Sequence, residues 1–277
     1  MNEIQGILNK KYRFLEKSIK DMGRALVAFS GGVDSTFLLK AVRDALGRDN
    51  VLAVMALSET TPAHERHDAL RLAERLDVGL LSVEGQEMGD PDFLANSPER
   101  CYICKKIRLG ALFQIARERG LDFVLDGENI DDHKDFRPGI RASRELGVRS
   151  PLSEAGFSKE EIRRLSKNLG LPTWRKPSYA CLASRIPFDN PITAEKLKQV
   201  DSAEEYIREL LSHAQVRVRH HGDMARIEVE PSRLETIIQE DNRKLIAAHL
   251  KDLGFKFVVL DLGGYRTGSL NPENPPV

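Results

Sequence analysis

The residues best suited to chemistry are the six from Ser30 to Ser35, which read Ser-Gly-Gly-Val-Asp-Ser. They follow an apolar run, residues 25–29, and precede a helical pattern that extends to Leu46, so a buried strand turns into a helix here. The first turn of a helix presents unpaired N–H groups and a partial positive charge, which bind anions. The glycines permit close backbone approach, and the serines add hydroxyl donors. This segment therefore predicts a phosphate or pyrophosphate site.

The acidic residue of this turn, Asp34, indicates that a metal ion accompanies the phosphates. A Walker-type loop would carry a lysine before the helix, and no lysine stands between Gly32 and Thr36. A carboxylate beside phosphates is repulsive unless a divalent cation bridges them. The alternative is a glycine-rich turn with a serine cap and no ligand. We expect Mg-ATP to be bound through its pyrophosphate end by Ser30, Gly31, Gly32, Asp34 and Ser35.

The hexapeptide, placed directly after a strand, resembles the PP-loop of the ATP pyrophosphatases. The resemblance implies an enzyme that cleaves ATP between the α and β phosphates. It also implies that the enzyme adenylates a carbonyl or carboxylate oxygen of its substrate.

The elements around this segment predict an α/β fold. Near-continuous apolar strands separated by helices predict a parallel sheet covered on both faces, whose ligands bind beyond the carboxyl ends of the strands. The expected strands are residues 25–29, 51–57, 78–83 and 123–125. We expect a parallel-sheet PP-loop domain (adenine nucleotide alpha hydrolase-like) over residues 1–189 and a smaller α/β domain over 190–277. In the smaller domain, helices are expected at 193–211 and 234–250 and strands at 215–220, 226–230 and 255–262.

A second candidate for the nucleotide site follows the fourth expected strand, at residues 126–132. By itself, this segment is an ordinary turn rich in Asn and Asp. It also resembles the G-x-N-x-D-D segment that faces the nucleotide in the PP-loop superfamily. The resemblance implies that Gly127 and Asn129 lie at the nucleotide, with Gly127 permitting close backbone approach.

Three cysteines need a chemical explanation: Cys101 and Cys104 form a C-x-x-C pair, and Cys181 stands alone. Positive neighbours favour the thiolate, which is both the nucleophile and the metal ligand. Such neighbours are Lys105, Lys106, Arg108 and Arg185. Four interpretations are open: buried structural cysteines, a redox pair, a zinc site, or a [4Fe-4S] cluster. Because clusters are normally held by four thiolates, three would leave one iron open, for example to an exogenous sulfide.

The motifs together resemble the LarE family of ATP-dependent sulfur transferases, over nearly the whole chain. They are the PP-loop, the C-Y-x-C-K-K/R pattern, G-x-N-x-D-D, and P-S-x-A-C-L-A-S-R-I-P around Cys181. The resemblance implies a role in nickel-pincer nucleotide biosynthesis, with pyridinium-3,5-biscarboxylic acid mononucleotide as substrate. One branch of the family lacks the C-x-x-C, and the cysteine matching Cys181 gives up its own sulfur. In the other branch, cysteines matching Cys101, Cys104 and Cys181 hold a [4Fe-4S] cluster with a removable sulfide, which implies a catalytic role for Cys181.

A pair of arginines in the tail is a candidate for the substrate phosphate. Arg217 and Arg219 are two residues apart on an alternating segment, so a strand would point both to one face. Guanidinium groups bind phosphate with paired hydrogen bonds. The alternative is a solvated charged face of a sheet, and the family resemblance favours the phosphate role. Arg266 is a third, weaker candidate.

The composition makes several other classes of protein less favoured. The chain has 277 residues and no apolar stretch near the ~20 residues that a membrane span requires, and its N-terminus lacks a signal-peptide core, so we expect a cytoplasmic protein. Lys plus Arg equals Asp plus Glu at 42 each, which argues against a nucleic-acid substrate. A tRNA thiolation enzyme, an ATP-dependent amide synthetase and an ATP-binding sensor are the rival interpretations. The family resemblance implies a homo-oligomer that uses ATP, a small nucleotide substrate, and sulfide or another sulfur donor.

Overall fold

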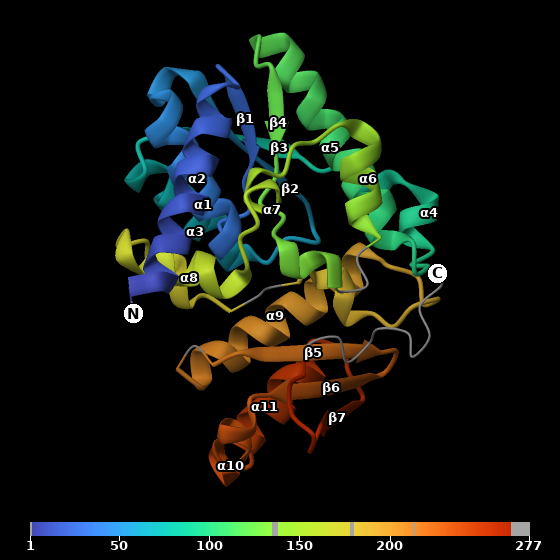
Figure 1. Cartoon of the computed structure of the whole chain (residues 1–277). Coiled ribbons are helices and arrows are strands. Elements are labelled where there is room, and N and C mark those ends of the chain that lie inside the picture. Colours follow the sequence, from blue (N-terminus) through green and yellow to red (C-terminus); the bar gives the residue numbers. More distant parts are fainter. Residues whose placement is uncertain (1, 135–137, 178–179, 213, 267–277) are drawn as a thin grey trace. The chain divides into compact units, whose positions relative to one another are not determined.

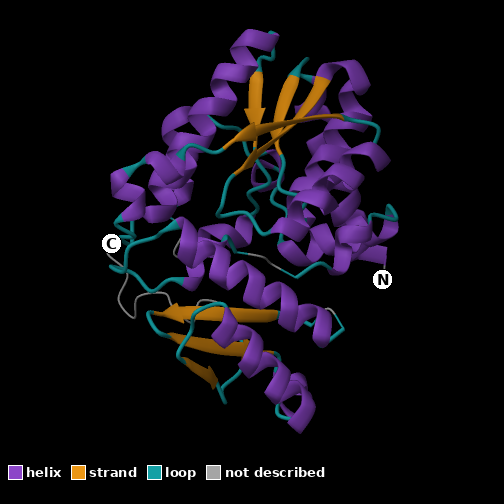
Figure 2. Cartoon of the chain, turned by 180° about the vertical axis from the view of Figure 1, so that it is seen from behind, coloured by secondary structure: helices purple, strands orange, loops and turns teal. Residues whose placement is uncertain are grey.

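The computed structural model describes residues 2–134, 138–177, 180–212 and 214–266. They belong to two compact units, shown from two sides in Figures 1 and 2. The first unit takes its residues from 1–58, 63–87 and 99–179, and the second from 59–62, 88–98 and 180–277. The second unit therefore includes two short segments from the first part of the chain. The division into functional domains at residues 189 and 190 stays a prediction.

The first unit contains a four-stranded parallel sheet in the order β3-β2-β1-β4. Its strands are β1 (Ala25–Ala28), β2 (Val51–Leu57), β3 (Gly79–Glu84) and β4 (Phe123–Leu125). Ala25 pairs with Val51 on one side and with Phe123 on the other, so β1 is central. The four predicted strands and the α/β class are confirmed. The chain builds the sheet outward from β1 through β2 and β3, then returns to the other side of β1 with β4.

Helices cover both faces of this sheet (Figure 2). They are α1 (Asn2–Lys20), α2 (Val33–Leu46), α3 (Ala63–Arg75), α5 (Arg100–Arg119), α6 (Gly139–Leu146), α7 (Pro151–Glu154) and α8 (Lys159–Asn168). One core joins α1, α2, α3 and α8 to one face of β1 and β2, with Phe37 and Phe157 in edge-to-face contact. A second core joins Leu109 and Leu112 of α5 to Leu26 and Val124 on the opposite face. This two-sided burial explains the near-continuous apolar strands.

Two local features of the helices bear on the candidate site. A capping box begins α8: Ser158 accepts from the Glu161 N–H, and the Glu161 carboxylate accepts from the Ser158 N–H. Helix α5 begins at Arg100, so both residues of the C-x-x-C pair are helical.

The second unit contains a three-stranded sheet in the order β5-β6-β7, with β5 (Val216–His221), β6 (Met224–Val229) and β7 (Phe257–Leu260). β5 and β6 form an antiparallel hairpin, and β7 pairs in parallel with β6. Its helices are α4 (Pro91–Leu94), α9 (Ala194–Leu210), α10 (Leu234–Ile237) and α11 (Glu240–Asp252). The single helix expected at 234–250 is wrong, because Gln239 has non-helical backbone angles (φ −53°, ψ 142°) and is the N-cap of a separate helix, α11.

Gly127, directly after β4, is the position where an added methyl group is expected to disturb the first unit most specifically. A Cβ at this residue would lie 2.9 Å from the Ser35 amide nitrogen and 3.1 Å from the Asp34 carbonyl carbon, both in α2. Because backbone atoms cannot rotate away, Gly127→Ala should lower the free energy of unfolding by about 1–3 kcal/mol. Urea denaturation measures the change.

Gly110 provides the matched control on α5. A Cβ there would meet nothing within 4 Å, and the residue is exposed in the middle of a helix. Gly110→Ala should therefore raise the free energy of unfolding by about 0.5–1 kcal/mol. Equal stability of the two variants would show that the loop after β4 is not packed on α2 as described.

Candidate functional site

The loops after β1 and β4 meet at the carboxyl edge of the parallel sheet. Ligands of open parallel sheets bind where the chain order reverses, which in this sheet is between β1 and β4. Ser30–Ser35 follows β1, and Gly127 lies against the backbone of its last two residues. The structure thus brings the two predicted nucleotide segments together. The close approach allowed by Gly127 is to the α2 backbone.

Gly31 and Gly32 of the first segment have different structural roles. Gly31 has a φ of +68°, and a Cβ there would lie 3.2 Å from the Ala69 Cβ of α3, so both conformation and space require glycine. Gly32 is the N-cap of α2, and no side chain in the described residues caps the helix at this position. Ser30 and Ser35 place their hydroxyl oxygens 3.0 Å apart. The N–H groups of the α2 first turn are thus left for an anion.

Asp34 is paired with a lysine that the sequence interpretation missed. Its Oδ2 accepts a hydrogen bond from Lys159 Nζ, while its Oδ1 is buried with no hydrogen-bond partner among the described residues. Burial raises the pKa of the Asp34 carboxyl, and the positive charge of Lys159 opposes this shift only in part. Lys159 is the first residue of α8, and its backbone N–H donates to Asp131 Oδ2 at 2.9 Å. The acidic segment after β4 therefore positions the partner of Asp34.

Asn129 is buried and acts within its own loop. Its Oδ1 accepts from the Asp131 N–H at 3.0 Å, and its own N–H donates to Asp132 Oδ2 at 3.0 Å. These are the turn contacts of the alternative interpretation. A nucleotide contact of the Asn129 side chain stays a prediction.

A second basic residue missed from sequence, Lys176, lies at the glycine turn. Its Nζ donates to the Gly31 carbonyl oxygen at 3.2 Å and is 3.5 Å from Asp68 Oδ2. Arg163 of α8 fixes this segment, because its guanidinium donates to the carbonyl oxygens of Trp174 and Lys176 at 2.8 and 2.9 Å. Lys159 and Arg163 are four residues apart and therefore lie on one face of α8. This spacing is the feature of the sequence that could have indicated these two residues.

The cysteine pair occupies the first turn of α5, with Cys101 exposed and Cys104 half-buried. Their spacing of three residues puts both thiols on one face of the helix. Lys105 lies on the same face and donates to Asp126 Oδ2 at 2.9 Å. Asp126 directly precedes Gly127 in the chain. The pair is thus held beside the loop that follows β4.

Arg108, one turn further along α5, is bound at the carboxyl end of β2. It contacts the fully buried Glu87 carboxylate, and its guanidinium donates to Ser58 Oγ at 3.0 Å. Burial by itself would raise the pKa of Glu87, but hydrogen bonds from Arg108 and Ser58 outweigh it and hold this pKa below its usual value. Arg108 and Lys105 are therefore paired with buried carboxylates of the protein. Lys106 contacts the Tyr102 hydroxyl and the exposed Glu145 carboxylate.

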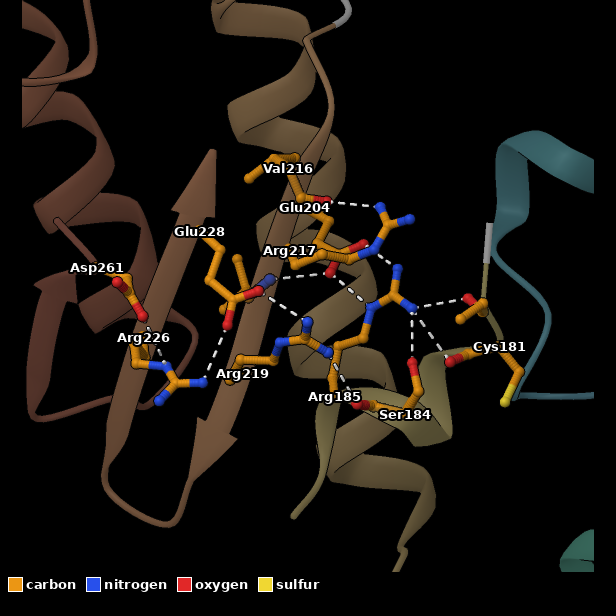
Figure 3. Close-up of polar contacts among 12 residues, drawn as sticks. Cys181, Ser184, Arg185, Glu204, Val216, Arg217, Arg219, Arg226, Glu228 and Asp261 are labelled. Carbon is orange, nitrogen blue, oxygen red and sulfur yellow. Dashed lines mark hydrogen bonds and ion pairs between the residues drawn. The ribbon is translucent and has the colours of Figure 1, made fainter. Parts of the chain in front are cut away.

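Cys181, half-buried, precedes a short 3-10 helix (Leu182–Arg185) in the second unit, and Figure 3 shows its surroundings. Arg185 is fully buried, and its NH1 group donates to the carbonyl oxygens of Ala180 and Cys181 at 2.7 and 3.1 Å. Its Nε and NH2 donate to the two oxygens of Glu204 at 2.7 and 2.8 Å. Burial would raise the pKa of Glu204, but the Arg185 charge outweighs it and the pKa lies below its usual value. Ser178 and Tyr179 of the same motif lie outside the described residues.

Arg217 and Arg219 lie on β5 and share a face, as predicted, but both are buried, with 2% and 5% of their surface exposed. The alternative of a solvated charged face is therefore wrong. Arg219 donates to Glu228 Oε2 at 2.7 Å and to the Ser184 carbonyl oxygen at 3.0 Å (Figure 3). Burial lowers the pKa of Arg217, and the charge of nearby Arg185 adds to this shift.

Arg266 is exposed and follows Tyr265 in the chain. The Tyr265 ring lies 5.2 Å from the Arg217 guanidinium carbon, and the Tyr265 N–H donates to the Val229 carbonyl oxygen at 2.8 Å. The turn after β7 therefore returns to the end of β6 and brings the neighbour of Arg266 to Arg217.

The three cysteines are distributed over both units and are not disulfide-bonded. Within the described residues, no group of three or more His, Cys, Asp or Glu side chains is gathered as a metal site. No described helix is long and apolar enough to cross a membrane.

Comparison with known proteins places these motifs in a family. A family model described as NAD synthase matches residues 7–118. A pyridinium-3,5-bisthiocarboxylic acid mononucleotide synthase from Lactiplantibacillus plantarum is 40% identical over 95% of this chain and 95% of its own length. An uncharacterized protein from Synechocystis is 41% identical over 96% of this chain and 98% of its own length. A tRNA-specific 2-thiouridylase from Thermus thermophilus is 27% identical over 56% of this chain and 53% of its own length.

The two longer matches extend over nearly the whole length of this chain. The match to the thiouridylase extends over little more than half of the chain. On the identity and coverage of the longer matches, this protein belongs to the LarE family of the PP-loop ATP pyrophosphatases.

Proposed function

We propose that this chain is an ATP-dependent sulfur transferase that acts on pyridinium-3,5-biscarboxylic acid mononucleotide, in nickel-pincer nucleotide biosynthesis. It would convert a carboxylate to a thiocarboxylate and release AMP and pyrophosphate. The observation that carries the proposal is the uncapped glycine turn before α2, at the reversal point of the parallel sheet. The 40% identity with a bisthiocarboxylic acid mononucleotide synthase, across nearly the whole chain, supports the choice of substrate.

The residues of the turn fit Mg-ATP. The N–H groups of the α2 first turn and the hydroxyls of Ser30 and Ser35 would hold the phosphates. The buried Oδ1 of Asp34, which has no hydrogen-bond partner in the described residues, is an oxygen ligand of the kind that Mg²⁺ prefers. Lys159 is already paired with Asp34, so Mg²⁺ must compete with this lysine.

Adenylation makes the carboxylate carbon reactive toward a nucleophile. A free carboxylate is a poor electrophile because its leaving group would be an oxide. When the carboxylate oxygen attacks the α phosphorus of ATP, pyrophosphate leaves and a mixed anhydride with AMP forms. A sulfur nucleophile then attacks the carbonyl carbon, and AMP leaves with the original oxygen, giving a thiocarboxylate.

We propose that Arg217, Arg219 and Arg266 hold the phosphate of the nucleotide substrate. Burial of Arg217 and Arg219 in the second unit supports this role for these two residues, because a desolvated guanidinium binds an anion more strongly than an exposed one. Arg219 binds the Glu228 carboxylate, whereas Arg217 donates to the Val216 carbonyl oxygen at 2.8 Å, and Arg217 is the residue used for the test.

For the sulfur source, we propose that Cys101, Cys104 and Cys181 hold a [4Fe-4S] cluster. The donor set fits the group, because all three are accessible thiols outside disulfides and two lie on one turn of α5. When bound, the cluster would supply a removable sulfide at its open iron. In the alternative, Cys181 donates its own sulfur.

We further propose a cytoplasmic homo-oligomer. β7 is a terminal strand of its sheet among the described residues, and Phe257 and Val259 on it are exposed, as is Leu262 beyond it. An apolar strand edge of this kind is usually covered in stable proteins. Nucleic acid is not expected as a partner, since the net charge is zero.

The ATP site is tested at Asp34. Asp34→Asn should abolish the Mg-dependent formation of AMP and pyrophosphate, because the metal-binding charge is lost. It should keep the fold, because the amide oxygen can still accept a hydrogen bond from Lys159. Asp44→Asn, near the other end of α2, is the matched control and should keep the wild-type rate. Radioactive pyrophosphate release measures both variants. A normal rate in Asp34→Asn, or release of ADP in place of AMP, would place the chemistry elsewhere.

The phosphate site is tested by Arg217→Lys, which keeps the charge and loses the paired hydrogen bonds. Hydrogen bonds to a charged group contribute roughly 1.5–3 kcal/mol, so affinity for the substrate should fall about tenfold or more. ATP affinity should be nearly unchanged. Arg243→Lys, exposed on α11, is the control. Calorimetric titration of each ligand measures the affinities, and equal loss of both would count against a dedicated phosphate site.

The sulfur source is tested by the three single variants Cys101→Ala, Cys104→Ala and Cys181→Ala after anaerobic purification. Each should lose iron, acid-labile sulfide and visible absorption together, since three thiolates share one cluster. With sulfide supplied, the wild type should turn over repeatedly and retain an intact Cys181 in its mass spectrum. If Cys181 becomes dehydroalanine while the Cys101→Ala, Cys104→Ala double variant is active, the sulfur comes from Cys181 itself.

A further inference from the structure

One face of α5 carries both the cysteine pair and two basic residues that bind the sheet edge. Cys101, Cys104, Lys105 and Arg108 are spaced by three, one and three residues, so they lie together on the helix surface. Arg108 binds beside the end of β2, and Lys105 binds beside the end of β4. The part of α5 that carries the thiols is therefore attached to the same edge of the sheet as residues Ser30–Ser35, the candidate anion-binding turn.

Asp126, the partner of Lys105, is held on both of its oxygens. Oδ2 accepts from Lys105 Nζ at 2.9 Å and from Ser143 Oγ at 3.0 Å. Oδ1 accepts from Ser150 Oγ at 2.7 Å and from the Glu128 N–H at 3.3 Å. Asp126 is 6% exposed. A carboxylate fixed by this many contacts can move only together with its loop.

The same loop rests on the anion-binding turn through the next residue. Gly127 lies so close to the Ser35 amide nitrogen that a Cβ would be 2.9 Å away. On the other side, Gly139 of α6 lies against Lys105 and the Cys101 carbonyl oxygen, at 3.1 and 3.5 Å from its ideal Cβ position. Contacts therefore continue without interruption from the α2 first turn to the α5 first turn.

We propose that Lys105 is a positioning residue that couples occupancy of the anion-binding turn to the cysteine pair. The inference rests on the proposed binding of Mg-ATP at that turn. Phosphates bound to the α2 N–H groups change the position of the Ser35 backbone, which carries Gly127 and Asp126 with it. The Lys105 ion pair transmits that displacement to the first turn of α5, so nucleotide binding changes how the thiols are presented.

The experiment measures alkylation of full-length, iron-free protein by iodoacetamide, with and without saturating Mg-ATP. Mass spectrometry of the peptide that contains Cys101 and Cys104 gives the rates. In the wild type, Mg-ATP should change the rate by about fivefold or more, which corresponds to an ordinary coupling between two sites. In Lys105→Met, the rate should no longer depend on Mg-ATP, while the Kd for ATP stays within about twofold of the wild type.

Lys106→Met is the matched control, because Lys106 is the next residue on α5 and contacts Tyr102 and not Asp126. It should retain the nucleotide effect. Asp126→Asn, whose Oδ1 can still accept from Ser150 Oγ while its Nδ2 can donate to Ser143 Oγ, provides a second break of the same ion pair and should also lose the effect. Circular dichroism verifies that each variant is folded.

The outcomes separate the coupling from the nucleotide site. A wild type that binds ATP with no change in alkylation overturns the coupling and leaves the nucleotide site standing. Retention of the effect in Lys105→Met or in Asp126→Asn also overturns it. A wild type that fails to bind Mg-ATP overturns the proposed function and the coupling together. A higher rate in Lys105→Met that still responds to Mg-ATP would indicate a merely structural role for the lysine.

Discussion

The close contact between Gly127 and the backbone of α2 is the constraint on which the candidate nucleotide site depends. In a parallel sheet, the loops that follow neighbouring strands are crowded at the carboxyl edge. Here the loop after β4 lies directly on the first turn of α2. A side chain at this position would separate the two loops. With glycine, the acidic loop reaches Lys159 through Asp131, and Lys159 reaches Asp34. One small residue thus sets the relation between the two candidate nucleotide segments.

Buried ion pairs then fix the segments that carry the cysteines. Lys105, Arg108 and Arg185 each bind a carboxylate that is largely removed from water: Asp126, Glu87 and Glu204. Such pairs contribute little net stability, because desolvation of both charges offsets their attraction, but breaking one leaves a costly buried charge. They therefore hold geometry. The basic residues near the cysteines are in this respect parts of the scaffold, with charges already balanced by acids of the same unit.

Buried ion pairs also fix the surroundings of β5 in the second unit. Glu204 of α9 accepts from the Val218 N–H on the outer edge of β5 and from Arg185 beside Cys181. Glu228 on the neighbouring strand accepts from Arg219 and Arg226 (Figure 3). The Cys181 segment and β5 are therefore joined through the Glu204 carboxylate and through Arg219, which donates to the Ser184 carbonyl oxygen. A substrate phosphate at Arg217 would add a negative charge to a region that already balances several arginines.

The sequence by itself determined the strands, the α/β class, the glycine turn and the grouping of motifs, because each depends on local pattern: apolar runs, glycine spacing and a capping box. It could not determine the ion pairs. Lys159 lies 125 residues from Asp34, and Glu204 lies 19 residues from Arg185, so no local spacing announces either contact. Burial was equally hidden, since the alternation around Arg217 fits a solvated face as well as a buried one. Only the tertiary structure decides which charges meet, because long-range packing determines which of them lose water and must be paired.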